Sequence, residues 1–173
     1  MSPQPTIFGD RTKAADRLYH ELHDTFGDAD LCFAITPGGA HLAGPAVLAT
    51  SGTLQMLDVF GLHPPLVRNA SRKRVWLFDD GSLDDQCLAS TAQLLQEAGA
   101  ATVGVASATT GRRLKELARG AIQFVVTLAW RDEIDPDKAL WSTPHPLLAD
   151  TLRSLEAGHQ PASPTTWLSL IHI

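Results

Sequence analysis

The sequence predicts an α/β protein with a doubly wound, mainly parallel sheet and helices on both faces. Short apolar runs alternate along the chain with segments whose apolar residues have helical spacing. Turns rich in glycine, aspartate or threonine follow three of the apolar runs, as expected for strand-to-helix connections in a parallel sheet. The chain has 173 residues, of which 44% are hydrophobic, and this is enough for one compact domain with a core.

The first helix is expected over residues 13–26. Its apolar residues share one helical face: Ala15, Leu18, Leu22 and Phe26. The apolar run LCFAIT, residues 31–36, predicts a buried strand. A PGG turn and a helix of small residues from about 41 to 51 follow, and Pro45 is compatible with that helix only in its first turn.

The next stretch is irregular, and we expect in it a short strand near 57–60 and then a mobile loop with a basic end. The run VWLF, residues 75–78, is the clearest strand. A helix is expected at 84–98, with Gly99 as its cap. Its buried face is predicted to contain Leu88, Thr91, Ala92 and Leu95. The remaining elements are expected to be a strand at 102–108, a helix at 111–118, a strand at 121–130, a loop at 131–146 and a last helix at 146–157.

Three regions are expected along the chain: a flexible arm at 1–12, a single domain at 13–158 and a tail at 159–173. The tail ends in SLIHI, which resembles the translation of a common sequencing adaptor, so we expect native sequence to end near residue 168. No signal-peptide pattern and no apolar run of membrane-spanning length is present in the sequence, and a cytoplasmic location is the expectation.

Charge and cysteine content exclude several functions. The net charge is −5 and no strongly basic block occurs, which argues against nucleic-acid and membrane-surface binding. Cys32 and Cys87 lie beside apolar residues outside any CxxC pattern, and we expect both to be buried, reduced thiols. No Cys/His spacing matches a zinc ligand set.

The segment VWLFDDGSLDDQC carries the main candidate residues. Asp79 and Asp80 end a buried strand, where carboxylates are costly unless they bind something. This favours a ligand or metal role, and a structural turn is the alternative. Asp84 and Asp85 are expected to cap the following helix and complement its dipole. The alternative is that they join the first pair in holding a divalent ion such as magnesium.

Two further motifs invite a functional interpretation. SATTGRR follows a strand and opens a helix, so Arg112 and Arg113 are candidates for an anion site. Trp130 and Trp141 flank the acidic loop, and either is a candidate to stack on a base. The alternative is that they cover the edge of the core.

The order of these pieces resembles the type I phosphoribosyltransferases over roughly residues 13–130. In that family the central strand has four apolar residues and Asp-Asp, and a Thr-Thr-Gly-x-Thr loop follows. Residues 75–78, Asp79 and Asp80 match this pattern. The resemblance implies a protein of nucleotide metabolism that moves or binds a ribose 5-phosphate group. Its donor would be phosphoribosyl pyrophosphate (PRPP) with magnesium.

The resemblance also implies two groups of site residues. The aspartates would bind the ribose hydroxyls and the metal and would be catalytic, whereas the glycine turn and the acidic loop would hold pyrophosphate and 5′-phosphate. The implied catalytic and metal-binding residues are Asp79 and Asp80, and the implied substrate-binding residues are Gly38, Gly39, Gly81, Ser82 and Asp84.

The phosphate loop departs from the family pattern. Leu83-Asp84-Asp85-Gln86-Cys87 replaces Thr-Thr-Gly-x-Thr, and the family's phosphate-admitting glycine is Asp85. At roughly 4 Å, each pair of like charges costs on the order of 4 kcal/mol in a partly screened medium. Pro37 also stands where the family often has a basic residue.

Three functions therefore remain open. The first is a phosphoribosyltransferase, a glycosyltransferase that uses magnesium. The second is a catalytically inactive binding or regulatory module with the same fold. The third is a magnesium-dependent enzyme of phosphoryl chemistry that uses the aspartate cluster. The expected partners are a phosphoribosyl or nucleotide ligand and either a second copy of the chain or another protein.

Overall fold

A computed structural model describes residues 6–26, 29–49, 53–57 and 68–142. The strands are β1 (Leu31–Ala34), β2 (Thr53–Met56), β3 (Arg74–Asp79), β4 (Thr102–Thr110) and β5 (Phe124–Trp130). The helices are α1 (Arg11–Phe26), α2 (Pro37–Ala49), α4 (Asp85–Glu97) and α5 (Leu114–Leu117), with a 3-10 turn, η1 (Arg131–Glu133).

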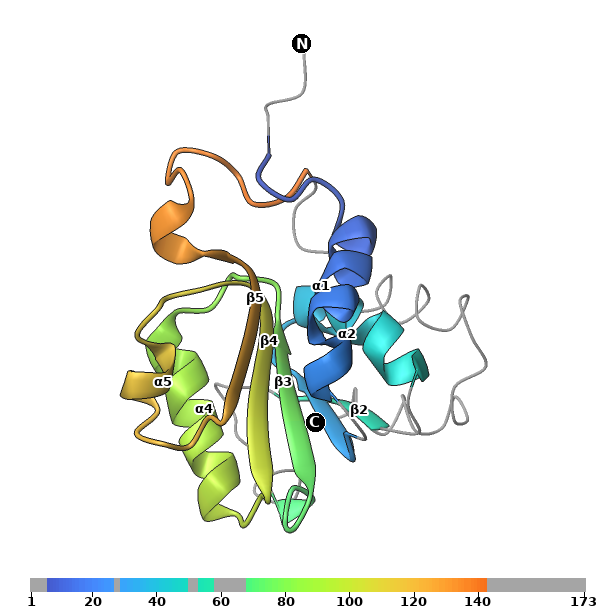
Figure 1. Cartoon of the computed structure of the whole chain (residues 1–173), viewed down its shortest axis with the longest axis vertical. Helices are drawn as coiled ribbons and strands as arrows, with labels where there is room; N and C mark the ends of the chain where they lie inside the picture. The colour runs from blue at the N-terminus through green and yellow to red at the C-terminus, as the bar shows by residue number, and fades with distance from the viewer. Residues whose placement is uncertain (1–5, 27–28, 50–52, 58–67, 143–173) are drawn as a thin grey trace.

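The five strands form one sheet in the order β2-β1-β3-β4-β5, and every pair is parallel. Helices α1 and α2 cover one face of this sheet, and α4 and α5 cover the other (Figure 1). The predicted doubly wound α/β fold is confirmed. Ala34 lies opposite Phe78, and Asp79 lies opposite Ser107, so the carboxyl ends of β1, β3 and β4 meet at one edge of the sheet.

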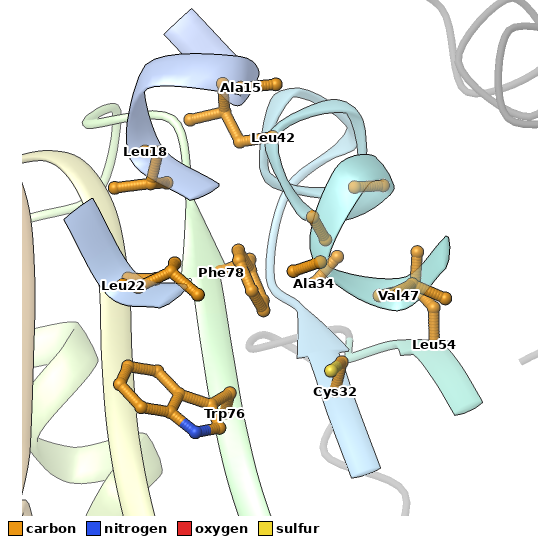
Figure 2. Packing of buried hydrophobic residues seen from close by; sticks show 14 of the residues in the cluster. Ala15, Leu18, Leu22, Cys32, Ala34, Leu42, Val47, Leu54, Trp76 and Phe78 are labelled. Carbon is orange, nitrogen blue, oxygen red and sulfur yellow. The ribbon is translucent and has the colours of Figure 1, made fainter. Parts of the chain in front are cut away.

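Two apolar clusters hold the helices to the sheet. β3 supplies both, because alternate side chains of a strand point to opposite faces. Trp76 and Phe78 lie beneath α1 and α2, where Figure 2 shows Leu18, Leu22 and Leu42 gathered over them. On the other face, residues of β3 and α4 form the second cluster, which includes Val75, Leu77, Leu88, Ala92 and Leu95. The predicted buried faces of these helices are therefore confirmed for the side chains that are described.

The start of α2 differs from the prediction. The helix begins at Pro37, so Gly38 and Gly39 lie in its first turn and Pro45 lies in its interior. Thr36 caps this earlier start, because its Oγ1 accepts a hydrogen bond from Gly39 N at 2.9 Å. Pro37 suits the first helical position, where no N–H is required. The prediction that Pro45 falls in the first turn was wrong.

Other boundaries differ by a few residues. β2 lies at Thr53–Met56 instead of 57–60, and β5 begins at Phe124 instead of residue 121. Gly120 turns the chain with a φ of 86°, and Ala121 N bonds to Ala118 O, which delays the start of β5. β4 continues to Thr110, and α5 has only four residues. The loop at 58–67, the helix at 146–157 and the tail at 159–173 lie outside the described residues.

The described part of the expected N-terminal arm is hydrogen-bonded to a distant segment. Ile7 N and Phe8 N donate to Ala139 O and Leu140 O at 3.1 and 3.0 Å. Gly9 forms a parallel bridge with Trp141. These contacts bring the start of α1 and the segment after η1 together above the carboxyl ends of the strands (Figure 1). Among the described helices, none has the length and apolar character needed to cross a membrane.

Candidate functional site

Asp79 and Asp80 lie at the carboxyl end of β3, and both are completely buried. Asp79 organises the turn that follows. Its Oδ2 accepts hydrogen bonds from Gly81 N at 2.8 Å and from Leu83 N at 3.4 Å. Ser107 Oγ donates to the same oxygen at 3.4 Å. Burial, and then the negative charge of Asp80, raise the pKa of Asp79 to about 6, although these hydrogen bonds act in the opposite direction.

Asp80 forms a buried ion pair with Arg11. Arg11 Nη2 and Nε lie 3.0 and 3.3 Å from Asp80 Oδ2, and the two side chains are 4% and 0% exposed. Asp80 Oδ1 accepts a hydrogen bond from Ser82 N at 3.3 Å. Trp141 completes the enclosure, because its Nε1 donates to Asp80 O at 3.1 Å and its ring lies 4.7 Å from the Arg11 guanidinium carbon. The predicted aspartate pair is therefore enclosed by Arg11 and Trp141, which lie far from it in the sequence.

Arg11 was missed at the sequence level. A signal was present, because Arg11 precedes Ala14, Ala15 and Leu18 on the apolar face of α1. A lone arginine on such a face requires a buried partner, since an unpaired internal charge is very costly. The sequence does not say which of the 19 acidic residues supplies it.

Gly38 and Gly39 let the start of α2 approach the end of β3. A Cβ on Gly38 would lie 1.9 Å from Asp80 Oδ2, and one on Gly39 would lie 2.3 Å from Phe78 O. The space next to both glycines is thus filled by the protein itself. The structure brings these glycines and the aspartate pair together, as the sequence predicts.

The loop from Gly81 to Cys87 is closed by carboxylates of the chain. Gly81, Ser82 and Leu83 donate their N–H groups to Asp79 or Asp80. Asp84 is the N-cap of α4, and its Oδ1 accepts a hydrogen bond from Cys87 N at 2.7 Å. The predicted capping role of Asp84 is confirmed.

Asp85 points away from the aspartate pair. Its Oδ1 accepts a hydrogen bond from Gly111 N at 2.9 Å and lies 3.4 Å from Arg131 Nη2. Arg131 Nη2 also donates to Leu83 O at 2.8 Å, so the end of β5 is attached to the loop. Asp84 and Asp85 thus form hydrogen bonds with the loop and with a neighbouring turn, and no observation favours a metal cluster of four aspartates.

The other candidate residues already have partners within the chain. Arg112 pairs with Asp132 at 3.1 Å and with Glu133, and Arg113 pairs with Glu116 at 3.0 Å. The Arg112 guanidinium also lies 5.0 Å from the Trp130 ring. These contacts fix the 111–113 turn against η1 and leave both guanidinium groups bound to carboxylates.

The two cysteines differ in how deeply they are buried. Cys32 is buried, as predicted, and burial raises the pKa of its thiol to about 12. Cys87 is only half-buried, so this part of the prediction was wrong. Burial, followed by the charges of Asp84 and Asp79, also raises the pKa of Cys87. Cys87 lies in the first turn of α4, which is why it is less enclosed than its apolar neighbours indicate.

The aspartate pair does not fit a magnesium ion in this arrangement. Magnesium requires open carboxylate oxygens and usually keeps several waters. All four oxygens of Asp79 and Asp80 already have protein donors, which include Thr36 Oγ1 at 3.4 and 3.5 Å and the Arg11 guanidinium. Within residues 6–26, 29–49, 53–57 and 68–142, no three His, Cys, Asp or Glu side chains converge on a common point.

Comparison with protein-family models and with curated protein sequences finds no match. Solved structures do match. The chain is similar to TT1426 from Thermus thermophilus, with a TM-score of 0.62 and 15% identity over 86% of this chain and 96% of that one. It is also similar to the allosteric regulatory enzyme of purine biosynthesis, with a TM-score of 0.50 and 15% identity over 69% of this chain and 35% of that one.

A third structure, the purine phosphoribosyltransferase from Pyrococcus horikoshii, aligns with a TM-score of 0.48 and 14% identity over 78% of this chain and 90% of that one. At these identities the likeness concerns the fold. The chain has a phosphoribosyltransferase-like α/β fold, as the resemblance of its central strand and loop implies.

Proposed function

We propose that this protein is a non-catalytic module with the phosphoribosyltransferase fold, which acts by binding a partner and does not transfer a phosphoribosyl group. One observation carries this proposal. The N–H groups of Gly81, Ser82, Leu83 and Cys87 all donate to the chain's own carboxylates. In the family that the sequence resembles, this loop is the cradle of the 5′-phosphate.

A phosphate that entered this loop would have to displace the carboxylates of Asp79 and Asp80, which are both completely buried. Asp79 is completely buried, so it would lose its donors without gaining water. A dianion placed beside an ionised aspartate adds like-charge repulsion on the order of 4 kcal/mol, which corresponds to roughly a thousandfold loss of affinity. The loop in this form is therefore expected to reject PRPP.

The ion pair between Arg11 and Asp80 supports the same proposal. For Asp80 to bind a ribose hydroxyl, its carboxylate would have to turn away from Arg11. Breaking a buried pair costs about 3–5 kcal/mol, because one charge is left without a partner. Gly38 packs directly against this carboxylate, and Trp141 Nε1 donates to the backbone carbonyl of Asp80.

Phosphoribosyl transfer with magnesium is the second candidate. It is favoured by the position of the aspartate pair beside Gly38 and Gly39, at the carboxyl ends of neighbouring strands. In this alternative, Asp79 and Asp80 would orient the ribose of the donor, Gly38 and Gly39 would admit pyrophosphate, and Gly81, Ser82 and Asp84 would lie along the 5′-phosphate. Arg11 would first have to leave Asp80.

Pyrophosphate release distinguishes the two candidates. The purified protein would be incubated with PRPP, millimolar magnesium and a panel of purine and pyrimidine bases. The Asp79→Asn/Asp80→Asn double variant serves as the matched control. We expect the wild type to release no more pyrophosphate than this control. Sustained release by the wild type that either single Asn substitution abolishes would refute the proposal and establish the transferase.

A further inference from the structure

Strand β5 forms one edge of the sheet, and its sequence lacks the features that usually protect an edge. Edge strands commonly carry charges, proline or bulges, or they are very short. β2, at the opposite edge, has four residues and includes Gln55. β5 has seven residues, FVVTLAW, and none of them is charged, proline or glycine. In the described part of the chain, β4 is the only strand that pairs with β5 (Figure 1).

The side chains of β5 are incompletely covered on both faces. Phe124 is 42% exposed and is the exposed large hydrophobic residue of the described segments. It stacks on Trp76, with ring centroids 6.2 Å apart. Val126 and Leu128 pack against the first cluster and Val125 packs against the second, but all three side chains are only partly buried. An apolar strand in this position is suited to contact with another protein surface.

The register of β4 and β5 shows which backbone groups point outward. Val103 O accepts a hydrogen bond from Gln123 N, and Val103 N donates to the side-chain Oε1 of Gln123, so the backbone groups of Val103 face the β5 side. Alternate residues of a strand face the same neighbour. With Gly104 opposite Phe124, the even-numbered residues of β5 bond to β4. The N–H and C=O groups that point away from the sheet then belong to Val125, Thr127 and Ala129.

These outward residues are arranged symmetrically about Thr127. An antiparallel copy centred on Thr127 would place Thr127 opposite itself and Val125 opposite Ala129. All six outward-pointing N–H groups of the two strands would then donate to carbonyls of the other strand. Phe124 would face Trp130 of the other copy, and Val126 would face its Leu128. Aromatic and aliphatic cross-strand pairs of this kind stabilise antiparallel pairing.

Charge is also complementary in this arrangement. Lys115 Nζ donates to Gln123 O at 2.9 Å, which places a positive charge at the start of β5. The segment that follows β5, residues 131–137, contains four acidic residues and one basic residue, and two of the acidic residues, Asp132 and Glu133, also pair with Arg112 of the same chain. An antiparallel pair brings the start of each strand against the end of the other, so opposite charges meet at both ends.

We propose that this protein forms a two-fold symmetric homodimer through antiparallel pairing of β5 with β5, which joins two five-stranded sheets into one of ten strands. The dimer is independent of whether the site at β3 is catalytic. The occupant is a second copy because the outward groups, the side-chain pairs and the charges are all self-complementary about Thr127. Binding of a different protein would not require the outward backbone groups, the side-chain pairs or the charges to be symmetric.

Sedimentation velocity over a range of concentrations provides the first test. The wild type is expected to sediment with the mass of two chains of 18.6 kDa each. Thr127→Lys would place two like charges opposite each other, and we expect dimer dissociation to become at least about tenfold more favourable. Thr127→Val, which keeps the branched shape, is the matched control and should remain dimeric. A monomeric wild type, or a dimer that Thr127→Lys leaves unchanged, would overturn the proposal.

Cross-linking tests the register and does not depend on how well the lysine variant folds. In a Cys87→Ser background, Thr127→Cys would place two thiols in directly opposite positions, with Cα atoms about 5.5 Å apart, a separation that a disulfide spans. Ala129→Cys is the control, because its two copies would lie about 14 Å apart along the strands. We expect mild oxidation to convert the first variant to a covalent dimer and to leave the second monomeric on a denaturing gel. Equal cross-linking of both, or of neither, would overturn the proposed pairing.

Discussion

The guanidinium of Arg11 lies 3.0 Å from the carboxylate of Asp80, and 69 residues separate these two in the chain. The pair joins the start of α1 to the end of β3 at the place where a ligand site is expected from the fold. Both side chains are almost fully withdrawn from water. A buried pair of this kind is hard to break from one side, because the remaining charge has no compensation.

Replacing Arg11 is therefore expected to destabilise the fold strongly. For Arg11→Met, we expect a loss of about 3–5 kcal/mol in the free energy of unfolding, measured in urea. Arg17→Met on the exposed side of the same helix is the control, with an expected change within about 0.5 kcal/mol. Adding Asp80→Asn to Arg11→Met should recover part of the loss, since it removes the stranded charge. A double variant less stable than Arg11→Met would contradict this interpretation.

Gly38→Ala is expected to damage the same contact by a steric route. The new methyl group would overlap Asp80 Oδ2 and force the carboxylate away from Arg11. We expect a cost of at least about 3 kcal/mol in unfolding free energy, comparable with breaking the ion pair. Gly120→Ala serves as the comparison, because Gly120 has a φ of 86° with no atom within 4 Å of the added carbon. It should cost only about 1 kcal/mol of backbone strain. Equal losses in the two variants would show that space at Gly38 is not the constraint.

The buried carboxylate of Asp79 predicts a specific pH dependence of stability. Its pKa is raised from 3.8 to about 6 in the folded protein, so the folded state binds the proton more tightly than the unfolded state. The resulting stabilisation is complete below about pH 4 and is lost as pH rises through about 6. The change amounts to about 3 kcal/mol.

Urea unfolding of the wild type and of Asp79→Asn at several pH values measures this contribution. Other acidic groups titrate in both proteins, so the difference between the two curves isolates Asp79. Relative to the wild type, Asp79→Asn should gain stability as pH rises from about 4 to 7. A constant difference across this range would mean that Asp79 ionises at its ordinary pKa in the folded protein.

Thiol reactivity should distinguish the two cysteines. At neutral pH, a thiol reagent is expected to modify only Cys87 in the folded protein, and slowly, because the pKa of this thiol is raised. Cys32 is enclosed in the core and its pKa is about 12, so it should react only after denaturation. Cys87→Ser should abolish the reaction of the native protein. Fast modification of that variant without denaturant would show that the core around Cys32 opens.

The parallel fold could be predicted because its signals are local. VWLF is a continuous apolar run, and the helix that follows has a capping aspartate, a periodic apolar face and a glycine at its end. The first turn of α2 was predicted incorrectly, because Gly38 and Gly39 favour a turn and nothing local reveals that Thr36 caps a helix beginning at Pro37. The short strand β2 was predicted four residues too late in the chain, because a strand of four residues gives only a weak periodic signal.

The site could be predicted only in part. Asp79, Asp80, Gly38 and Gly39 were expected near one another, and they lie in contact. What the sequence did not reveal is which groups form hydrogen bonds or ion pairs with these two aspartates. Arg11, Ser107 and Trp141 reach them from three separate elements, so their roles depend on tertiary packing. The sequence also allows Asp85 as a metal ligand, and its hydrogen bond to Gly111 N likewise depends on the approach of the end of β4.

Isothermal titration of PRPP into the protein, with and without magnesium, shows whether the loop that follows β3 is closed to phosphate. If the carboxylates of Asp79, Asp80 and Asp84 close the loop, no binding heat should appear up to millimolar ligand in either condition, with a folded protein confirmed by circular dichroism. Magnesium-dependent binding at micromolar PRPP would contradict the account, because it would require the loop to open and Arg11 to release Asp80.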